Sequence, residues 1–207
     1  MNLTLFAIVT GYLLGSIPTA YLLVRWQSRI DLRTAGSGNV GALNSFEVTR
    51  SRMVGLGVLM IDLLKGMAAV AAGRWIGGDA SSTGFVAALA AVAGHNFPVW
   101  LGGKGGRGLA TAAGASLVLG WGLVPLWCLA WALAFAGLRS VNPASTVACV
   151  VSPIVVFLLG HLLPGLPTAS VPWYPWFVFI LMVLILARLV GPTREYLQKL
   201  CARRRDT

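Results

Sequence analysis

The sequence predicts an all-α integral membrane protein with about seven transmembrane helices, some of them short, joined by glycine-rich cytoplasmic loops. Of its 207 residues, 57% are hydrophobic and only 11% are charged, whereas a soluble domain carries about a quarter charged residues. The mean hydropathy is +0.79. Basic residues are concentrated in alternate loops, which is the positive-inside pattern. We expect a single domain over residues 1–207.

Six apolar stretches follow one another along the chain. They cover residues 3–24, 53–73, 83–101, 109–137, 146–163 and 172–190. The first has no basic n-region and is already long enough to span a membrane, so it is not expected to be a cleavable signal. Tryptophans near the span ends are expected to be interface anchors; they are Trp75, Trp100, Trp121, Trp173 and Trp176.

The fourth stretch is too long for one simple span and contains Gly120 and Gly122. If it crossed once, Arg139 and the basic C-terminal residues would fall opposite the other basic loops. Two crossings, 109–120 and 123–138, place every basic loop on one side. The charge pattern therefore predicts seven spans, an external N-terminus and a cytoplasmic C-terminus.

The net charge of +10 is distributed in a way that argues against a nucleic-acid partner. Its predicted cytoplasmic contributors are Arg25, Arg29, Arg33, Arg50, Arg52, Lys104, Arg107, Arg139, Arg188, Arg194, Lys199, Arg203, Arg204 and Arg205. Membrane lipids and anionic substrates are the partners that such loops favour. The three cysteines have neither disulfide nor metal-site spacing, so no metal and no cofactor is predicted.

The first predicted cytoplasmic loop reads GSGNVG at 36–41, which satisfies G-x-G-x-x-G. A dinucleotide-binding fold is rejected, because the motif then needs a preceding strand, and Asp62, about 20 residues later, lies in an apolar span. The glycines still permit close approach to a phosphate, and Ser37, Asn39 and Asn44 can hydrogen-bond its oxygens. An ordinary glycine turn is the alternative.

Two features lie inside the first two spans. GSIPTAY at 15–21 suits close packing of small residues, or a helix in which Pro18 frees a backbone carbonyl. Asp62 and Lys65 are three residues apart, so they share a helix face and can pair in the protein interior. That pair either stabilises the bundle or lets Lys65 reach an anionic substrate.

The segment GHNFPVWLGGKGGRGLA at 94–110 concentrates glycines and cations between apolar stretches. His95 is a candidate general base or hydrogen-bond donor, and Lys104 a candidate anion ligand. The segment is not a Walker A loop, because Gly105 rather than serine or threonine follows Lys104.

On the same predicted side, RSVNPAS at 139–145 offers Arg139 as a phosphate clamp or as a simple positive-inside anchor. Asn142 and Ser145 can add hydrogen bonds. The motifs H-x-x-x-x-D, H-E-x-x-H and G-x-S-x-G are absent from the sequence.

Five segments together resemble the bacterial acyl-phosphate:glycerol-3-phosphate acyltransferases, the PlsY family. The segments are GSIPTAY, GSGNVGALN, DLLKG, GHNFPVWLGGKGGRGLAT and RSVNPAS. The resemblance implies an enzyme of phospholipid synthesis in the bacterial plasma (inner) membrane, with a cytoplasmic active site. Its implied reaction transfers a fatty acyl group from acyl phosphate to the 1-hydroxyl of glycerol 3-phosphate, giving lysophosphatidic acid and phosphate.

Loop chemistry and resemblance together give a set of predicted site residues. Catalytic roles are expected for His95, Lys104 and Ser37. Substrate binding is expected for Gly36, Gly38, Asn39, Gly41, Asn44, Lys65, Gly105, Gly106, Arg107, Gly108, Arg139, Asn142 and Ser145. Either His95 or the acceptor's own phosphate is expected to take the hydroxyl proton.

The resemblance has departures on the acceptor side. Leu43 stands where the family has threonine, and Glu47 stands where it usually has arginine. Asn142 replaces a serine, and Arg188 is not followed by the family's His-x-x-Asn. These departures leave two alternatives: the same acyl transfer to a different alcohol, or a non-catalytic lipid- or anion-binding membrane protein.

Overall fold

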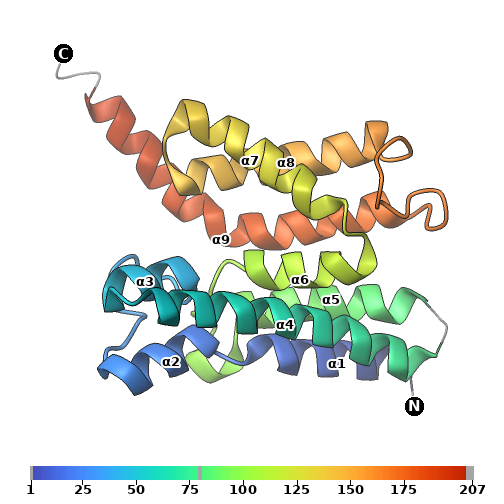
Figure 1. Ribbon diagram of the computed structural model, residues 1–207, viewed down its shortest axis with the longest axis horizontal. Helices are drawn as coiled ribbons and strands as arrows, with labels where there is room; N and C mark the ends of the chain where they lie inside the picture. Colours follow the sequence, from blue (N-terminus) through green and yellow to red (C-terminus); the bar gives the residue numbers. More distant parts are fainter. Residues whose placement is uncertain (1, 79–80, 204–207) are drawn as a thin grey trace. The chain divides into compact units, whose positions relative to one another are not determined.

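The computed structural model describes residues 2–78 and 81–203, and every regular element within these ranges is a helix (Figure 1). The helices are α1 (Leu3–Ser16), α2 (Thr19–Ser28), α3 (Ala42–Thr49), α4 (Arg52–Gly77), α5 (Ser81–Asn96), the 3-10 helix η1 (Val99–Leu101), α6 (Leu109–Leu119), α7 (Leu123–Leu138), α8 (Val141–Leu159) and α9 (Tyr174–Arg203). The chain forms two compact units, Met1–Gly120 and Trp121–Thr207. The single domain expected over 1–207 stays a prediction.

The predicted all-helical membrane fold is confirmed. Among the described residues, the stretches long and apolar enough to cross a membrane are Leu3–Ser28, Arg52–Gly77, Ser82–Leu101, Val141–Leu159 and Tyr174–Ala202. The shorter apolar helices are Leu109–Leu119 and Leu123–Leu138. The fourth apolar stretch is therefore divided into two helices, α6 and α7, between residues 119 and 123. This is where the charge pattern predicts two crossings instead of one. Arg204 and Arg205 of the predicted basic tail lie outside the described residues.

Small residues bring the helices of the first unit close together. α1 and α4 each pack against α5, and α4 also packs against α6. A Cβ atom at Gly11 would collide with the backbone carbonyl of Ala87 on α5, and one at Gly114 would collide with the carbonyl of Leu63 on α4. Because lipid removes the hydrophobic drive between helices, this backbone-to-backbone contact is what packing in a membrane uses.

Pro18 breaks the first apolar stretch, where one continuous span over 3–24 was predicted. α1 ends at Ser16 and α2 begins at Thr19. Pro18 has φ −86° and ψ 65°, close to an inverse γ-turn. The Thr19 N–H donates to the Ile17 carbonyl at 2.9 Å across this turn. The proline lacks the N–H needed to continue α1, so the chain changes direction here.

The predicted loop at 139–145 is wrong, because α8 begins at Val141 rather than near residue 146. Asn142 and Ser145 therefore lie in the first turns of a helix. Pro143 fits there because the first turn leaves its N–H groups without helical acceptors. Two more helical segments were not predicted: α3 within the first loop, and the continuation of α9 from residue 190 to Arg203.

Three helices end on an arginine with left-handed backbone. Arg29 follows α2, Arg50 follows α3 and Arg139 follows α7, with φ of 57°, 54° and 47°. The backbone N–H of each donates to the carbonyl four residues earlier. These are the non-glycine residues with positive φ in the described part of the chain.

The second unit is built around α8, which packs against both α7 and α9. One stripe of α9 is buried at helical spacing, formed by Tyr174, Phe177, Leu181, Ile185 and Leu189. α7 and α8 are further linked by the Trp127 Nε1–H, which donates to Cys149 Sγ at 3.4 Å. The Tyr196 hydroxyl of α9 donates to the Leu138 carbonyl at 2.8 Å.

The packing of α1 on α5 predicts a sharp contrast between two glycine-to-alanine substitutions. Gly11→Ala places a methyl group against the Ala87 carbonyl and is expected to lower stability by about 1–3 kcal/mol, the usual cost of overpacking. Gly57→Ala is the matched control, because its Cβ would meet only Leu23 at 3.8 Å. Thermal unfolding in detergent measures both. Equal melting temperatures would show that α1 and α5 do not pack this closely.

Candidate functional site

A glycine-rich loop follows α5 and projects Lys104 from the protein surface. Gly102 and Gly103 have φ of 59° and 77°, which a side chain would make costly. The Gly103 N–H donates to the Pro98 carbonyl at 3.0 Å, and the Lys104 N–H donates to the Leu101 carbonyl at 3.2 Å. The turn is therefore fixed by its own backbone, while the Lys104 side chain is exposed.

Beyond Lys104 the loop turns inward and joins α6. Gly105, Gly106 and Gly108 are buried, and Arg107 is half-buried. The Gly106 N–H donates to the His95 carbonyl at 3.1 Å, which ties the loop back to the end of α5. The loop thus presents one exposed cation, Lys104, that can pair with an anion. The N–H groups of Gly103, Lys104 and Gly106 are already bonded within the protein.

Three ionisable side chains meet below this loop, in the interior of the first unit. Lys65 Nζ lies 2.8 Å from Asp62 Oδ1, and both side chains are at most 5% exposed. His95 Nδ1 lies 3.7 Å from the same oxygen. Lys65 Nζ also donates to the Ile17 carbonyl at 3.0 Å. The predicted Asp62–Lys65 pair is therefore present, and His95 and the helix break at Pro18 lie beside it.

A small pocket connects the helix break with the glycine loop. Its lining residues are Ser16, Ile17, Pro18, Thr19, Ala20, Val40, Asp62, Lys65, His95, Pro98, Gly105 and Gly106. The space it leaves for the centre of a water-sized sphere is about 10 Å³, close to what one water needs. In this conformation the pocket is too small for a phosphate group.

Asn44 organises the loop at 36–44 instead of pointing away from it. Its Oδ1 accepts from the Ser37 N–H at 2.9 Å. Its Nδ2 donates to the carbonyls of Ala35 and Asn39 at 3.1 and 2.9 Å. Both amide hydrogens are thus used inside the loop, and direct substrate contact by Asn44 stays a prediction. Ser37 is exposed at the surface of the same loop.

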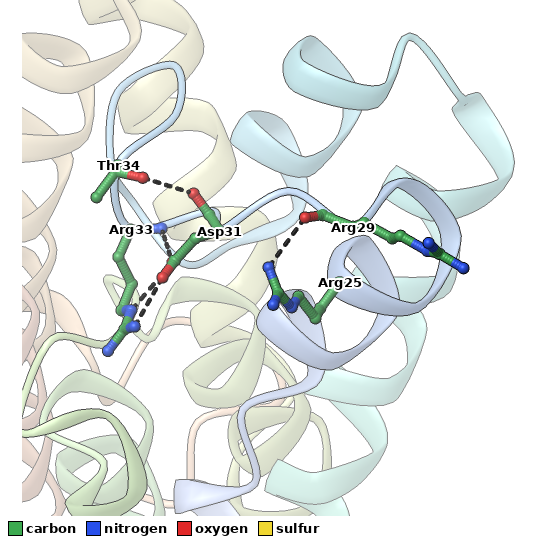
Figure 2. A network of polar contacts seen from close by, with 5 residues as sticks. All are labelled: Arg25, Arg29, Asp31, Arg33 and Thr34. Carbon is green, nitrogen blue, oxygen red and sulfur yellow. Dashed lines mark hydrogen bonds and ion pairs between the residues drawn. The ribbon is translucent and has the colours of Figure 1, made fainter.

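The segment that leads into this loop carries a polar network (Figure 2). Arg33 Nη2 lies 2.7 Å from Asp31 Oδ2, and Arg33 Nε donates to Asp31 Oδ1 at 3.0 Å. The Arg33 guanidinium also lies over the Tyr21 ring, 5.3 Å from its centroid. Nearby, Arg25 Nη1 donates to the Arg29 carbonyl at 2.9 Å. The network fixes the path of the chain from α2 to the loop at 36–44.

Arg33 keeps the Asp31 carboxyl ionised. Hydrogen bonds from the Arg33 side chain and backbone lower the pKa of Asp31 from 3.8 to about 2. A lowered carboxyl pKa stabilises the fold above the unfolded value, and this contribution disappears as the pH falls towards about 2. The Asp31 carboxylate therefore stays ionised beside Arg33 near neutral pH.

The structure brings most of the predicted site residues together at one end of the first unit. α2, α3 and the α5–α6 connection gather there (Figure 1), and with them lie Gly36, Ser37, Gly38, Asn39, Gly41, Asn44, Lys104, Gly105, Gly106, Arg107 and Gly108. Within the second unit, Arg139 is exposed at the end of α7. Ser145 is buried in α8, and its hydroxyl donates to the Val141 carbonyl at 2.8 Å. Asn142, half-buried, lies in the first turn of α8.

Some contacts were not predicted from the sequence. Trp100 was expected only as an interface anchor, yet its Nε1–H donates to the Ser16 hydroxyl at 2.9 Å and connects η1 to the end of α1. The Lys65–Ile17 bond was also missed. Pro18 was a signal for it, because a proline inside an apolar span leaves carbonyls that need donors. No group of three potential His, Cys, Asp or Glu metal ligands is found in ranges 2–78 and 81–203.

Comparison with known proteins gives a consistent result over most of the chain. The family described as glycerol-3-phosphate acyltransferase matches residues 5–199. A glycerol-3-phosphate acyltransferase of Synechococcus sp. strain JA-3-3Ab is 43% identical over 166 residues, which is 78% of each chain. One from Bradyrhizobium sp. strain BTAi1 is 39% identical over 155 residues, 75% of this chain and 77% of its own.

Two crystal structures are also similar. The glycerol 3-phosphate form of PlsY, an integral membrane glycerol 3-phosphate acyltransferase, has a TM-score of 0.75 and 31% identity. Its lysophosphatidic acid form has a TM-score of 0.72 and 30% identity. Each similarity covers 97% of this chain and 93% of the other.

The hydrogen bonds of Asn44 predict that its loss loosens the loop. In Asn44→Ala, backbone amides of residues 35–44 are expected to exchange with solvent at least about fivefold faster, because one lost hydrogen bond is worth about 1 kcal/mol. Hydrogen exchange followed by mass spectrometry measures this. Asn39→Ala is the matched control, since no side-chain hydrogen bond of Asn39 is found in the described part of the chain. Unchanged exchange in Asn44→Ala would contradict the assigned role.

Proposed function

Because the chain belongs to the glycerol-3-phosphate acyltransferase family, we propose that it transfers a fatty acyl group from acyl phosphate to the 1-hydroxyl of glycerol 3-phosphate. The products are lysophosphatidic acid and inorganic phosphate. The observation that carries this proposal is the fixed glycine loop, which presents the exposed Lys104 at the same end of the unit as the loop at 36–44. An acyltransferase whose two substrates are both anionic needs cationic side chains and close approach to the backbone to bind them.

The chemistry requires no covalent enzyme intermediate. Acyl phosphate is a mixed anhydride, so the acceptor hydroxyl oxygen bonds to the carbonyl carbon while the bond from that carbon to the phosphate oxygen breaks. The phosphate leaves with the bonding electrons, and the hydroxyl proton passes to a base. Lys104 is assigned to the phosphate and the developing negative charge, and the backbone at Gly105 and Gly108 keeps its predicted role there. The Gly106 N–H already donates to the His95 carbonyl.

Two bases are compatible with the site. His95 lies below the loop, with its carbonyl bonded to Gly106 and its ring 3.7 Å from Asp62. The phosphate of glycerol 3-phosphate is the other candidate base, because it belongs to the same molecule as the reacting hydroxyl. Ser37 and Asn39 are assigned to positioning the acceptor. Arg107 keeps its predicted role in holding substrate, while the roles predicted for Arg139, Asn142 and Ser145 of the second unit stay predictions.

We place this multi-pass membrane protein in the bacterial inner membrane, with the N-terminus outside and the site in the cytoplasm. The support comes from charge within the first unit. Cationic side chains of α2, of the α3–α4 connection and of the α5–α6 loop lie at the end that holds the site, whereas Arg74 lies in the last turn of α4 at the other end. This asymmetry follows the positive-inside rule.

The role of Lys104 predicts a loss of rate on its removal. Lys104→Ala is expected to lower kcat/KM at least about tenfold, equivalent to about 1.4 kcal/mol of transition-state stabilisation. Phosphate release from palmitoyl phosphate in a lipid phase, with and without glycerol 3-phosphate, measures it. Arg74→Ala removes a cation at the opposite end of α4 and is expected to leave the rate unchanged. Wild-type turnover in Lys104→Ala would reject the assignment.

Glu47 favours a second candidate, in which the same acyl transfer uses a less anionic alcohol. Glu47 is exposed on α3, one turn after Asn44, where the family resemblance places an arginine. A carboxylate near a phosphate-bearing acceptor is unfavourable. Competition between glycerol 3-phosphate and uncharged polyols in the same assay separates the two acceptors. Absence of phosphate release with every acceptor would indicate a binding role.

Reversal of this charge gives a direct prediction. Glu47→Arg is expected to lower the KM for glycerol 3-phosphate at least about fivefold, because a repulsion of about 1 kcal/mol becomes a charge-assisted attraction. Steady-state kinetics at saturating acyl phosphate measure it. Glu195→Arg, the same change at an exposed position of α9, controls for net charge. A KM that does not move would show that Glu47 is remote from the acceptor.

A further inference from the structure

We propose that Lys65 is a positioning residue that fixes the helix break at Ile17–Pro18, and through it the glycine-rich loop at 36–44. In this role Lys65 does not bind substrate. The inference rests on the proposed function, because the loop it positions is the one assigned to the acceptor. Four observations carry it, and all of them lie within the first unit.

The first observation is that both partners of Lys65 are protein groups. Its ammonium contacts Asp62 Oδ1 at 2.8 Å and the Ile17 carbonyl at 3.0 Å. The side chain is 5% exposed, and the pocket beside it holds about 10 Å³. To reach the Lys65 ammonium, a substrate phosphate would have to replace one of these two contacts. The space beside the ammonium is only about the size of one water.

The second observation is where the Ile17 carbonyl lies. It closes the turn between α1 and α2 by accepting the Thr19 N–H at 2.9 Å. The Thr19 hydroxyl also donates to this oxygen, at 3.5 Å, and Lys65 supplies a further donor to it from α4. The bond therefore ties the turn to α4 and sets the direction in which α2 leaves α1.

The third observation is that α2 and the loop share one buried apolar cluster. Its members are Ala20, Val24, Leu32, Val40, Val58 and Leu101. Two of them lie on α2, two on the segment that contains the glycine-rich loop, one on α4 and one on η1. Close-packed side chains transmit displacement, so a change in the direction of α2 moves the loop at 36–44.

The fourth observation is that Asp62 faces both parts of the site. The carboxylate that holds Lys65 also lies 3.7 Å from His95, whose carbonyl accepts the Gly106 N–H. The loop at 36–44 and the loop at 102–108 are thus both connected to the buried Asp62–Lys65 pair. Positioning both loops from a single point explains why two costly charges are kept inside an apolar bundle.

The test removes both charges at once. Removal of one partner leaves an uncompensated buried charge, whereas replacement of both by neutral side chains of similar size commonly preserves stability. Asp62→Asn/Lys65→Met and Asp62→Asn/Lys65→Gln are both made. Each is checked for a single symmetric peak in size-exclusion chromatography and for its melting temperature. Ser152→Ala, which removes a buried hydroxyl from α8, is the control for loss of a buried polar group.

Hydrogen exchange without substrate is the deciding readout. If Lys65 positions the loop, amides of residues 30–44 in a folded double variant exchange at least about fivefold faster than in the wild type, while α9 is unchanged. The KM for glycerol 3-phosphate is then expected to rise at least about tenfold, with a smaller change in kcat. Because the exchange is measured without substrate, it decides the positioning role even if glycerol 3-phosphate is not the acceptor.

The contrary outcomes are distinct. Unchanged exchange with lost activity would make Lys65 a direct substrate ligand. Unchanged exchange with unchanged activity would make the pair a support of the bundle alone. Failure of both double variants to fold would assign the charges to overall stability. Each of these results overturns the proposal.

Discussion

The Asp62–Lys65 contact is the interaction on which the arrangement of the first unit depends. Charges inside an apolar bundle must find their partners in the protein, because neither lipid nor bulk water can solvate them there. Lys65 meets this requirement with a carboxylate of its own helix and with the Ile17 carbonyl, which lies in the turn between α1 and α2. The break in the first span and the charge in the second are therefore one feature, since each satisfies the other.

The sequence allows some parts of this structure to be predicted, for identifiable reasons. The interruption near Gly120 follows from the parity of basic loops, a rule that acts on the whole chain and is insensitive to local packing. The Asp62–Lys65 pair follows from helix periodicity alone. The non-helical, glycine-rich segment around Lys104 follows from the chemistry of glycine. In each case the information lies within a short segment or in a global count.

Other parts depend on contacts that local patterning does not reveal, and here the sequence was a poor guide. The early start of α8 needs Pro143 to be placed in a first helical turn, while local patterning favours a loop. The inward amide of Asn44 depends on carbonyls that converge only when α3 forms. The bond from Trp100 to Ser16 joins residues 84 positions apart. For such contacts, residue type indicates the ability to bond but not the partner.

The arginines that end α2, α3 and α7 have a consequence for protein engineering. A left-handed residue with a side chain costs roughly 1 kcal/mol, and glycine is the usual remedy. At Arg29, Arg50 and Arg139 that remedy would also remove a cation from the negative end of a helix dipole and from the basic residues on which the proposed orientation in the membrane rests. A thermostabilised variant made in this way would gain rigidity while weakening its own insertion signal.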